Sequence, residues 1–191
     1  MTSLKLLGIS GSLRPESHNT NLLRNAEEVL PFDVDLELWR GLKAIPPYDE
    51  TDDVHPGPPA VEALRASIAE ADGILFATPE YNSSIPGQLK NALDWVSRPP
   101  ARSPLRNKPV AVVGASTGAF GAVWAQADLR KVLAAIGARV IDAEVAVGHA
   151  DARFDEDGRL VDEALREQLA ETVEDLAGEA RARAAALTQV A

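Results

Sequence analysis

Apolar residues along this chain form short runs of two kinds, and both kinds indicate β-strands. Uninterrupted runs, which are typical of strands buried on both faces of a parallel sheet, occupy residues 73–78 and 110–115, and residues 4–9 are a further strand candidate. Residues 34–39 alternate apolar with acidic side chains, which predicts a strand near a sheet edge. Residues 140–147 predict a last strand, interrupted by Asp142 and Glu144. The chain therefore contains five candidate strands.

Between these strands, apolar residues recur every three or four positions, as they do on the buried face of a helix. This spacing predicts helices over residues 19–30, 59–70, 86–96, 123–136 and 160–187. Alternating strands and helices indicate an α/β fold with a parallel sheet. Residues 41–59 are rich in Pro, Asp and Gly and predict a surface loop. The 191 residues, 46% of them hydrophobic, suit one domain covering residues 1–191.

A polar loop, residues 10–19, follows the first strand and leads into the first helix. Its glycine lets the backbone approach a ligand, the hydroxyls of Ser10, Ser12 and Ser17 can bond an oxyanion, and Asn19 can donate from its amide. The helix start adds partial positive charge, and an arginine in the loop suits phosphate oxygens. Neither a P-loop Gly-Lys-[Ser/Thr] nor a Gly-x-Gly-x-x-Gly fingerprint is present. The loop therefore predicts a phosphate site of another type, and an ordinary capped helix is the alternative.

Two further loops follow the strands at residues 73–78 and 110–115. Pro79 ends the first of these strands, and residues 80–84 offer main-chain donors and polar side chains before the next helix. Residues 116–121 are small, so a flat ring can lie against their backbone and their N–H groups can stabilise negative charge. Loops at the carboxyl ends of parallel strands meet at one edge of a sheet. Together the three loops predict a ligand site, although each alone could be a simple strand-to-helix connection.

These loops carry motifs that resemble one known family. The motifs are Ser-Gly-Ser-Leu-Arg-x-x-Ser-x-Asn from Ser10, Pro-Glu-Tyr-Asn-x-Ser-Ile-Pro-Gly-x-Leu-Lys-Asn-Ala-x-Asp-Trp-x-Ser-Arg-Pro from Pro79, and Ser-Thr-Gly-x-x-Gly from Ser116. They are similar to the NADPH-dependent FMN reductase family, which includes bacterial quinone, chromate and azo-dye reductases. The resemblance covers about residues 4–147 and implies a flavodoxin-like fold. In that fold a five-stranded parallel sheet, of strand order 2-1-3-4-5, lies between layers of helices.

The resemblance implies which residues hold each part of FMN. The first loop would bind the phosphate through Ser12, Leu13, Arg14, Ser17 and Asn19. The second loop would hold the ribityl chain and the ring edge through Pro79, Glu80, Tyr81, Asn82 and Ile85. The third loop would approach the pyrimidine side of the ring through Ser116, Thr117, Gly118 and Gly121. Residues 151–191 carry no family signature, so the outer edge of the site, and with it substrate preference, is not assigned.

The family also implies an activity, that of an FMN-containing oxidoreductase with NADPH or NADH as donor. We expect hydride transfer to FMN and then to a quinone, azo dye, metal oxyanion or free flavin. Donor and acceptor would use one face of the ring in turn, which predicts ping-pong kinetics. No side chain is required as a general acid or base, so no catalytic residue is assigned. Donors on Ser116, Thr117 and Gly118 are expected to stabilise the reduced flavin.

Three other functions are weighed against this one. A flavodoxin-type electron carrier would bind FMN without oxidising NAD(P)H, but Arg14 and an aromatic content of 5% favour an open enzyme site. A subunit that serves only assembly would take up no FMN. Residues 114–118 match the Gly-x-Ser-x-Gly pattern of hydrolases, yet His18, His55 and His149 are scattered and offer no evident catalytic partner.

Composition restricts the partners and the compartment. A formal net charge of −10 argues against nucleic-acid binding. The absence of cysteine excludes disulfides and thiolate ligands, and the scattered histidines predict no metal site. Because we find no signal-peptide core and no run of about 18 apolar residues, we expect a cytoplasmic protein that does not enter a membrane. The apolar residues near Trp95, Phe120 and Trp124, together with the family's usual assemblies, predict a homodimer or homotetramer that acts on a small-molecule acceptor.

Overall fold

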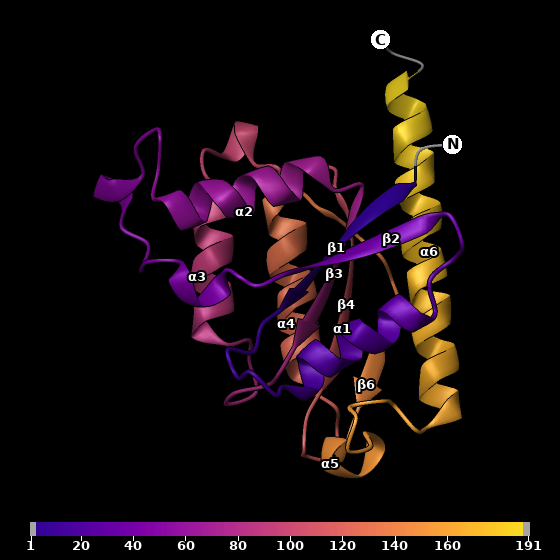
Figure 1. The fold of residues 1–191 in the computed structure, drawn as a ribbon. Coiled ribbons are helices and arrows are strands. Elements are labelled where there is room, and N and C mark those ends of the chain that lie inside the picture. The colour runs from indigo at the N-terminus through magenta and orange to yellow at the C-terminus, as the bar shows by residue number, and fades with distance from the viewer. Residues whose placement is uncertain (1–2, 189–191) are drawn as a thin grey trace.

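The structure is a computed structural model that describes residues 3–188. Its strands form one sheet (Figure 1), and they are β1 (Leu4–Ser10), β2 (Val34–Trp39), β3 (Gly73–Thr78), β4 (Pro109–Ala115), β5 (Arg139–Val140) and β6 (Val145–Val147). Every pairing is parallel, and the order is β2-β1-β3-β4-β5, with β6 also paired to β4. This is the strand order of flavodoxin-like folds, and it confirms the predicted topology.

The apolar pattern of each strand matches its place in the sheet. All residues of β3 and β4 are buried, as expected for central strands that are covered on both faces. In β2, at the sheet edge, Val34 and Leu36 are buried while Asp35 and Glu37 are exposed. The alternation in the sequence therefore indicated correctly an edge strand with one face on the core.

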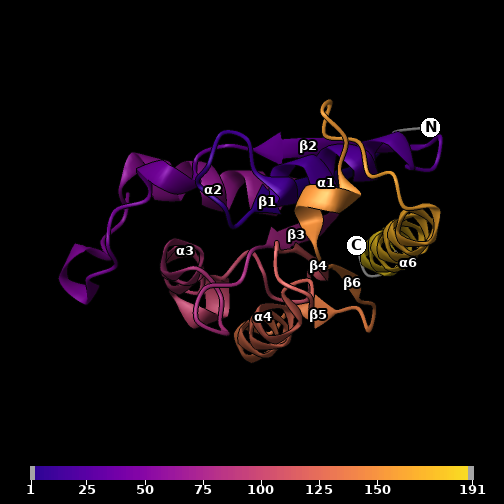
Figure 2. The same cartoon turned by 90° about the horizontal axis from the view of Figure 1, so that it is seen from below.

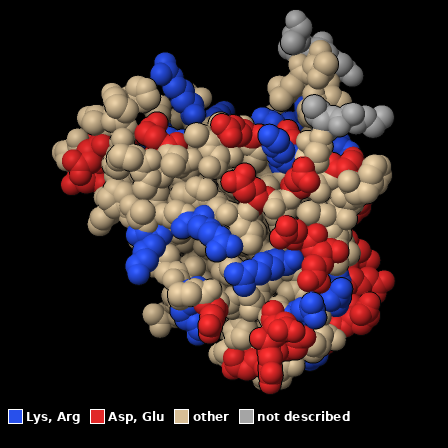
Figure 3. Space-filling view, in the orientation of Figure 1, with Lys and Arg blue, Asp and Glu red and all other residues tan. Residues whose placement is uncertain are grey.

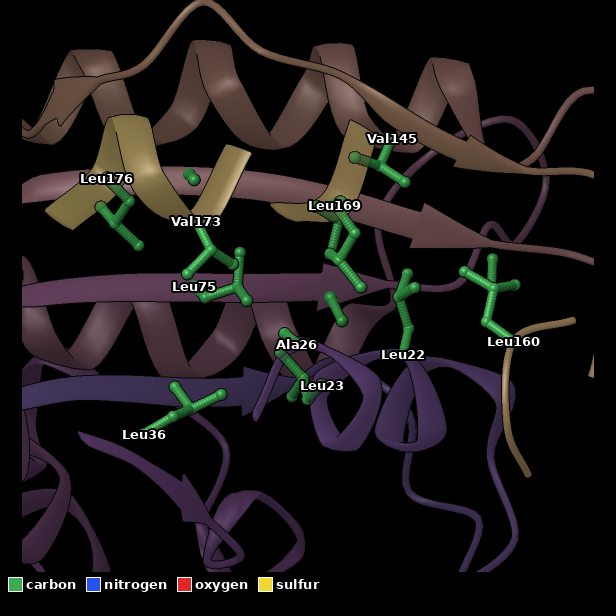
Figure 4. Close-up of a cluster of buried hydrophobic side chains, with 14 of the residues drawn as sticks. Leu22, Leu23, Ala26, Leu36, Leu75, Val145, Leu160, Leu169, Val173 and Leu176 are labelled. Atoms are coloured by element: carbon green, nitrogen blue, oxygen red, sulfur yellow. The ribbon is translucent and has the colours of Figure 1, made fainter. Parts of the chain in front are cut away.

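Helices cover both faces of the sheet (Figure 2). One face is covered by α1 (His18–Glu28) and α6 (Glu163–Thr188), and the other by α2 (Pro59–Glu70), α3 (Gly87–Val96) and α4 (Val123–Ile136). On the first face, Leu22 of α1 and Val173 of α6 belong to the same buried cluster as Leu75 of β3 (Figure 4). The five predicted helices are confirmed. Within residues 3–188, no helix combines the length and the apolar character that a bilayer span requires.

The predicted last strand, residues 140–147, is two strands rather than one. The first, β5, pairs with the start of β4, and the second, β6, pairs with its end, so that together they occupy the fifth position of the sheet. Between them Asp142 and Glu144 are exposed. The Arg130 guanidinium of α4 donates to the Ala143 carbonyl and to the Glu144 carboxylate. The acidic residues keep their charges in solvent and so break the strand, whereas the sequence predicted only an interruption of its pattern.

The segment at residues 41–59, which its composition predicts to be a surface loop, is partly buried. It contains two short 3-10 helices, η1 (Leu42–Ala44) and η2 (Glu50–Asp52). Leu42 and Ile45 are buried in the same core as α2 and α3. The indole Nε1 of Trp95 donates a 2.8 Å hydrogen bond to the Pro46 carbonyl, which fixes the segment to α3. The few apolar residues of this segment therefore belong to the core.

A buried lysine closes the amino end of the sheet, after η3 (Pro100–Arg102) and just before β4. Lys108 is 2% exposed, and its Nζ donates to the carbonyls of Ala69 and Ala71 at the end of α2. These are carbonyls that have no partner within the helix, and a cation suits the negative end of the helix dipole. Burial is the main reason that the pKa of Lys108 is lowered to about 8, and the charge of Arg183 adds to the effect.

Candidate functional site

The loops that follow β1, β3 and β4 meet at one edge of the sheet, as predicted. They enclose a cavity of about 140 Å³, which we call the three-loop cavity. Its lining consists of Ser12, Arg14, Ser17, His18, Asn19, Pro79, Glu80, Tyr81, Ala115, Ser116 and Thr117. The structure thus brings together most of the predicted cofactor-binding residues. The predicted residues that do not line this cavity are Leu13, Asn82, Ile85, Gly118 and Gly121.

The first loop gives the cavity a positive end. Ser17 caps α1, and its hydroxyl accepts a 3.2 Å hydrogen bond from the Asn19 amide N–H. The first turn of α1 contains no acidic residue, so its partial positive charge is not opposed. Arg14 is exposed, donates to the Glu16 carbonyl at 2.8 Å, and has no carboxylate partner within residues 3–188. Both features suit an anionic group.

Asn19 has a structural role that its place in the motif did not reveal. The residue is 2% exposed. Its amide nitrogen donates to the Ala115 carbonyl at 2.9 Å, and its carbonyl accepts from the Ala115 N–H at 3.0 Å. This pair of bonds joins the start of α1 to the end of β4 and so holds the first loop beside the third. One amide hydrogen of Asn19 is left for the predicted contact with a phosphate.

A tight turn shapes the second loop. Tyr81 and Ser84 exchange two backbone hydrogen bonds, of 3.0 and 3.2 Å. Between them, Asn82 and Ser83 have positive φ angles of 53° and 59°. Asn adopts this left-handed conformation more readily than most residues, and two such residues in succession suit a two-residue hairpin turn. The turn leaves Tyr81 exposed beside the cavity.

Glu80 links the second loop to α4. This helix follows Ala122, which has no side-chain group to cap it. A carboxylate oxygen of Glu80 instead accepts hydrogen bonds of 3.1 Å from the N–H groups of both Trp124 and Ala125. A carboxylate is favourable at the positive end of a helix. The negative charge of Glu80 is therefore directed to α4, which leaves Arg14 as the cation available for a ligand.

The third loop offers two donors to the cavity. The Ser116 hydroxyl accepts a 3.1 Å bond from the Gly118 N–H, and its own proton remains available. The Thr117 N–H makes no hydrogen bond with any residue from 3 to 188. Gly121 has a φ of 59°, and a Cβ there would lie 2.4 Å from the Ala146 carbonyl carbon. Only glycine fits this close approach to β6, so Gly121 shapes the loop through its backbone.

A contact between the first loop and the C-terminal segment was not predicted. Asp151, in the short helix α5 (Ala150–Arg153), has its carboxylate 2.9 Å from Nε2 of His18. The His18 ring also stacks on Phe154, with ring centroids 5.4 Å apart and planes at 21°. The sequence analysis assigned no role at the site to residues 151–191. Because the first of these contacts joins residues 133 positions apart and the second joins residues still farther apart, no local spacing could have revealed them.

Comparison with protein families shows to which family the chain belongs. The model of the family described as NADPH-dependent FMN reductase matches residues 4–152. The chain belongs to the NADPH-dependent FMN reductase family. It is 44% identical over 174 residues to an NAD(P)H-dependent FMN reductase of Pseudomonas aeruginosa, across 91% of this chain and 93% of that protein. It is 38% identical over 168 residues to a 2-hydroxy-1,4-benzoquinone reductase of a Burkholderia species, across 87% and 91%.

A solved structure supports the same assignment. FerB of Paracoccus denitrificans, a flavoenzyme NAD(P)H:(acceptor) oxidoreductase, matches with a TM-score of 0.81 at 29% identity, across 93% of this chain and 97% of that chain. Membership of the FMN reductase family confirms the predicted class, an oxidoreductase that uses FMN with NAD(P)H as donor. The family match ends at residue 152, so Phe154 lies just outside it.

The three-loop cavity fits the anionic tail of FMN, the cofactor of the FMN reductase family. A Cβ on Gly11 would lie 2.9 Å from Cδ2 of Leu89 and 3.3 Å from Cδ of Pro79, so only a bare backbone can run this close to the second loop. The Leu13 N–H has no hydrogen-bond partner among the described residues, whereas its side chain lines a neighbouring cavity. Leu13 can therefore meet a phosphate through its backbone, beside the Arg14 guanidinium.

Proposed function

We propose that this protein binds FMN in the three-loop cavity and transfers reducing equivalents from NAD(P)H to quinones. Azo dyes, metal oxyanions and free flavin would be reduced by the same route. The observation that carries the proposal is the convergence of three family motifs on a cavity whose cation, Arg14, has no carboxylate partner among residues 3–188. The resemblance of the chain to quinone-reducing relatives makes a quinone our first choice of acceptor.

The proposed contacts with the phosphate come from the first loop. Arg14 supplies a charge-assisted hydrogen bond, and the hydroxyls of Ser12 and Ser17 supply neutral ones. The Leu13 N–H and the remaining amide hydrogen of Asn19 complete the set. Asp151 acts from outside, because its bond to His18 keeps the first turn of α1 in place.

The second and third loops would position the rest of the cofactor. Pro79, Glu80, Tyr81, Asn82 and Ile85 form the second loop, which we assign to the ribityl chain and the ring edge. When bound, FMN supplies hydride acceptance from a nicotinamide and electron release to the acceptor. The Ser116 hydroxyl and the Thr117 N–H lie ready to donate to the pyrimidine side, where negative charge develops. Gly118 and Gly121 shape this loop by their backbone.

The 52% exposure of Tyr81 at the cavity supports a site that stays open beside a bound ring. The nicotinamide and the acceptor would then bind in turn on one face of the ring. The protein would then show ping-pong kinetics, with parallel lines in double-reciprocal plots of NADPH against quinone.

The experiment that tests this function uses the purified protein loaded with FMN. NADPH consumption is followed in the presence of a benzoquinone, an azo dye, chromate and free FMN under one set of conditions. The proposal predicts oxidation of NADPH with the highest kcat/KM for the quinone. FMN-loaded protein that oxidises no NADPH with any acceptor would be an electron carrier instead. Protein that takes up no FMN would refute the proposal.

The proposal includes assembly into a homodimer or homotetramer in the cytoplasm. Of the three aromatic residues that predicted an interface, Trp95 is buried in the core and offers no surface, whereas Phe120 and Trp124 are 64% and 47% exposed, and Tyr81 beside the cavity is 52% exposed. The rings of Phe120 and Trp124 pack edge to face with centroids 5.1 Å apart. A group of large exposed apolar residues is typical of an interface. Light scattering after size exclusion checks this part, and a monomeric mass at all concentrations would contradict it.

A further inference from the structure

A second cavity lies on the other side of the first loop. It has a volume of about 180 Å³ and is bounded by the first loop, α1, the end of β2 and η1. Ser12 lines both this cavity and the three-loop cavity, so the first loop is the wall between them. Neither the second nor the third loop contributes to its lining. Of the three family motifs only the first contributes to its lining, and the ligand implied for that motif, the FMN phosphate, is assigned to the three-loop cavity.

The charged side chains that line this cavity are all positive, and its two arginines also line a neighbouring cavity that includes Glu27, Glu28 and Glu37. Arg24, Arg40 and Lys43 line this second cavity, and no Asp or Glu does. This is notable in a chain that has 29 acidic and 19 basic residues. Figure 3 shows basic side chains across the middle of the face that carries α1 and β2, apart from the acidic side chains gathered at its lower right. We call this second cavity the basic cavity, and its charge selects an anion.

Two of these cations have no partner in the part of the chain that the structure describes. Arg40 and Lys43 form no ion pair and no side-chain hydrogen bond within residues 3–188. Arg24 donates to the Asn21 side-chain carbonyl at 2.7 Å, a neutral partner. Cations that stabilise a fold are usually paired with a carboxylate or a helix end, as Lys108 is. The cations of the basic cavity are instead free to bind a ligand.

The remainder of the lining is suited to a flat apolar group. Leu13, Leu38, Leu42 and Trp39 contribute to it. A Cβ on Gly41 would lie 2.4 Å from Cζ2 of Trp39, so the indole rests against the bare backbone of Gly41, and its packing on the core beside α2 and α3 restrains it. A fixed indole offers a stacking surface for an aromatic ring. A volume of about 150 Å³ is known to hold one benzene ring, so the basic cavity has room for one ring with a small substituent.

We propose that the basic cavity is a second small-molecule site, which binds an aromatic acid with a single ring. The ring lies against Trp39 and the leucines, and the carboxylate lies between Arg40 and Lys43. The cations and the flat apolar surface together distinguish this cavity from an ordinary solvated crevice, which would have only one of these features. The site is separate from the FMN site, and both can be filled at once.

The test uses benzoate as the probe and the FMN-loaded protein at constant ionic strength. The chain has three tryptophans, so the indole N–H region of an NMR spectrum holds three signals. Trp39 lies in the basic cavity, Trp95 is buried, and Trp124 is exposed close to the loops of the FMN site. The Trp39→Phe variant identifies the Trp39 signal by its loss. We expect this signal to shift and saturate with benzoate while the other two stay in place.

Two related probes separate the contributions of charge and ring. Cyclohexanecarboxylate has the charge without a flat ring, and benzyl alcohol has the ring without the charge. Both are expected to bind about tenfold more weakly than benzoate or not at all. Equal binding of either probe would overturn the assignment of an aromatic acid.

Variants locate the site. Replacing both Arg40 and Lys43 by glutamine is expected to weaken benzoate binding about tenfold. The matched control replaces Arg102 and Lys131, two exposed cations elsewhere, by glutamine and should leave binding unchanged. In a second variant, Gly41→Ala displaces the indole and should also weaken binding, and the NMR spectrum shows whether each variant is folded.

Three further results would overturn the proposal. The first is a Trp39 signal that does not move, or that moves linearly with benzoate and never saturates. The second is equal weakening by the control pair, which would indicate general attraction of anions to the surface. The third is release of FMN by benzoate with movement of the Trp124 signal, which would place the probe in the three-loop cavity.

Discussion

Two cations lie at opposite ends of the sheet and are held in opposite ways. At the amino end, Lys108 is buried and its Nζ donates to the carbonyls of Ala69 and Ala71. At the carboxyl end, Arg14 is exposed and has no carboxylate partner within the described residues. Burial disfavours the charged form of Lys108, against which its bonds to the two carbonyls must be set, whereas Arg14 contributes little to folding because it stays in water. One basic side chain is therefore part of the scaffold, and the other is available to a ligand.

The largest expected effect is a loss of stability on replacing Asn19, which tests whether the carboxyl end of the sheet also contains residues that stabilise the fold. Asn19→Ala removes both side-chain hydrogen bonds that Asn19 makes to the buried backbone of Ala115. We expect the free energy of unfolding to fall by about 3 to 5 kcal/mol, measured by urea denaturation without FMN. Asn19→Asp keeps the acceptor but not the donor. Its free energy of unfolding should therefore lie between those of Asn19→Ala and the unchanged protein. A loss below about 1 kcal/mol for Asn19→Ala would show that Asn19 serves the ligand alone.

The second prediction concerns the pH dependence of stability at the amino end. The pKa of Lys108 is about 8 in the folded protein and 10.5 in the unfolded chain, so the unfolded chain binds more protons between these values. Stability therefore rises with pH across this window, by about 3 kcal/mol relative to the Lys108→Met variant. The contribution is complete above pH 10.5 and is lost as the pH falls to about 8. Parallel pH profiles for the two proteins would contradict the lowered pKa.

The third prediction separates Arg14 from Lys108. Arg14→Ala removes a charge-assisted hydrogen bond to the proposed phosphate, so FMN should bind about 1 to 3 kcal/mol more weakly by flavin fluorescence. Unfolding of the FMN-free protein should change by less than about 0.5 kcal/mol. Arg102→Ala, at another exposed arginine, is the control and should alter neither quantity. Unchanged FMN affinity in the Arg14 variant would contradict the assignment of Arg14 to the ligand.

The smallest effect is expected at Glu80. Glu80→Ala removes the cap of α4 and should lower the free energy of unfolding by about 1 to 2 kcal/mol. Glu80→Gln keeps an acceptor oxygen and should cost less than half as much, with FMN affinity almost unchanged because the amide can keep the proposed contact with the cofactor. Glu70→Ala, at an exposed position, controls for loss of a negative charge. A larger effect of Glu80→Gln on FMN affinity than on stability would assign the carboxylate to the cofactor.

The sequence predicted the scaffold well because apolar periodicity reports burial directly. The runs at residues 73–78 and 110–115 are fully buried strands, and the alternation at 34–39 is an edge strand. The prediction was wrong where acidic residues occur within an apolar run, because such residues can either lie on the exposed face of one strand or separate two strands. Asp142 and Glu144 in a strand pattern predicted an interruption, but the exposed pair divides the strand in two.

At the site, the sequence predicted which residues come together but not how their polar groups are used. The motifs predicted that Asn19 and Glu80 contact the ligand, yet both side chains form hydrogen bonds with distant backbone groups. The His18 contacts with Asp151 and Phe154 depend on a segment far along the chain. Such pairings depend on three-dimensional distances, which neither residue type nor local spacing contains.

A crystal structure of the protein with FMN bound tests most directly whether the cofactor lies in the three-loop cavity. The account predicts the phosphate within hydrogen-bond distance of the Arg14 guanidinium and the Leu13 N–H, with the ring between the second and third loops. FMN bound anywhere else, with the three-loop cavity empty, would contradict it.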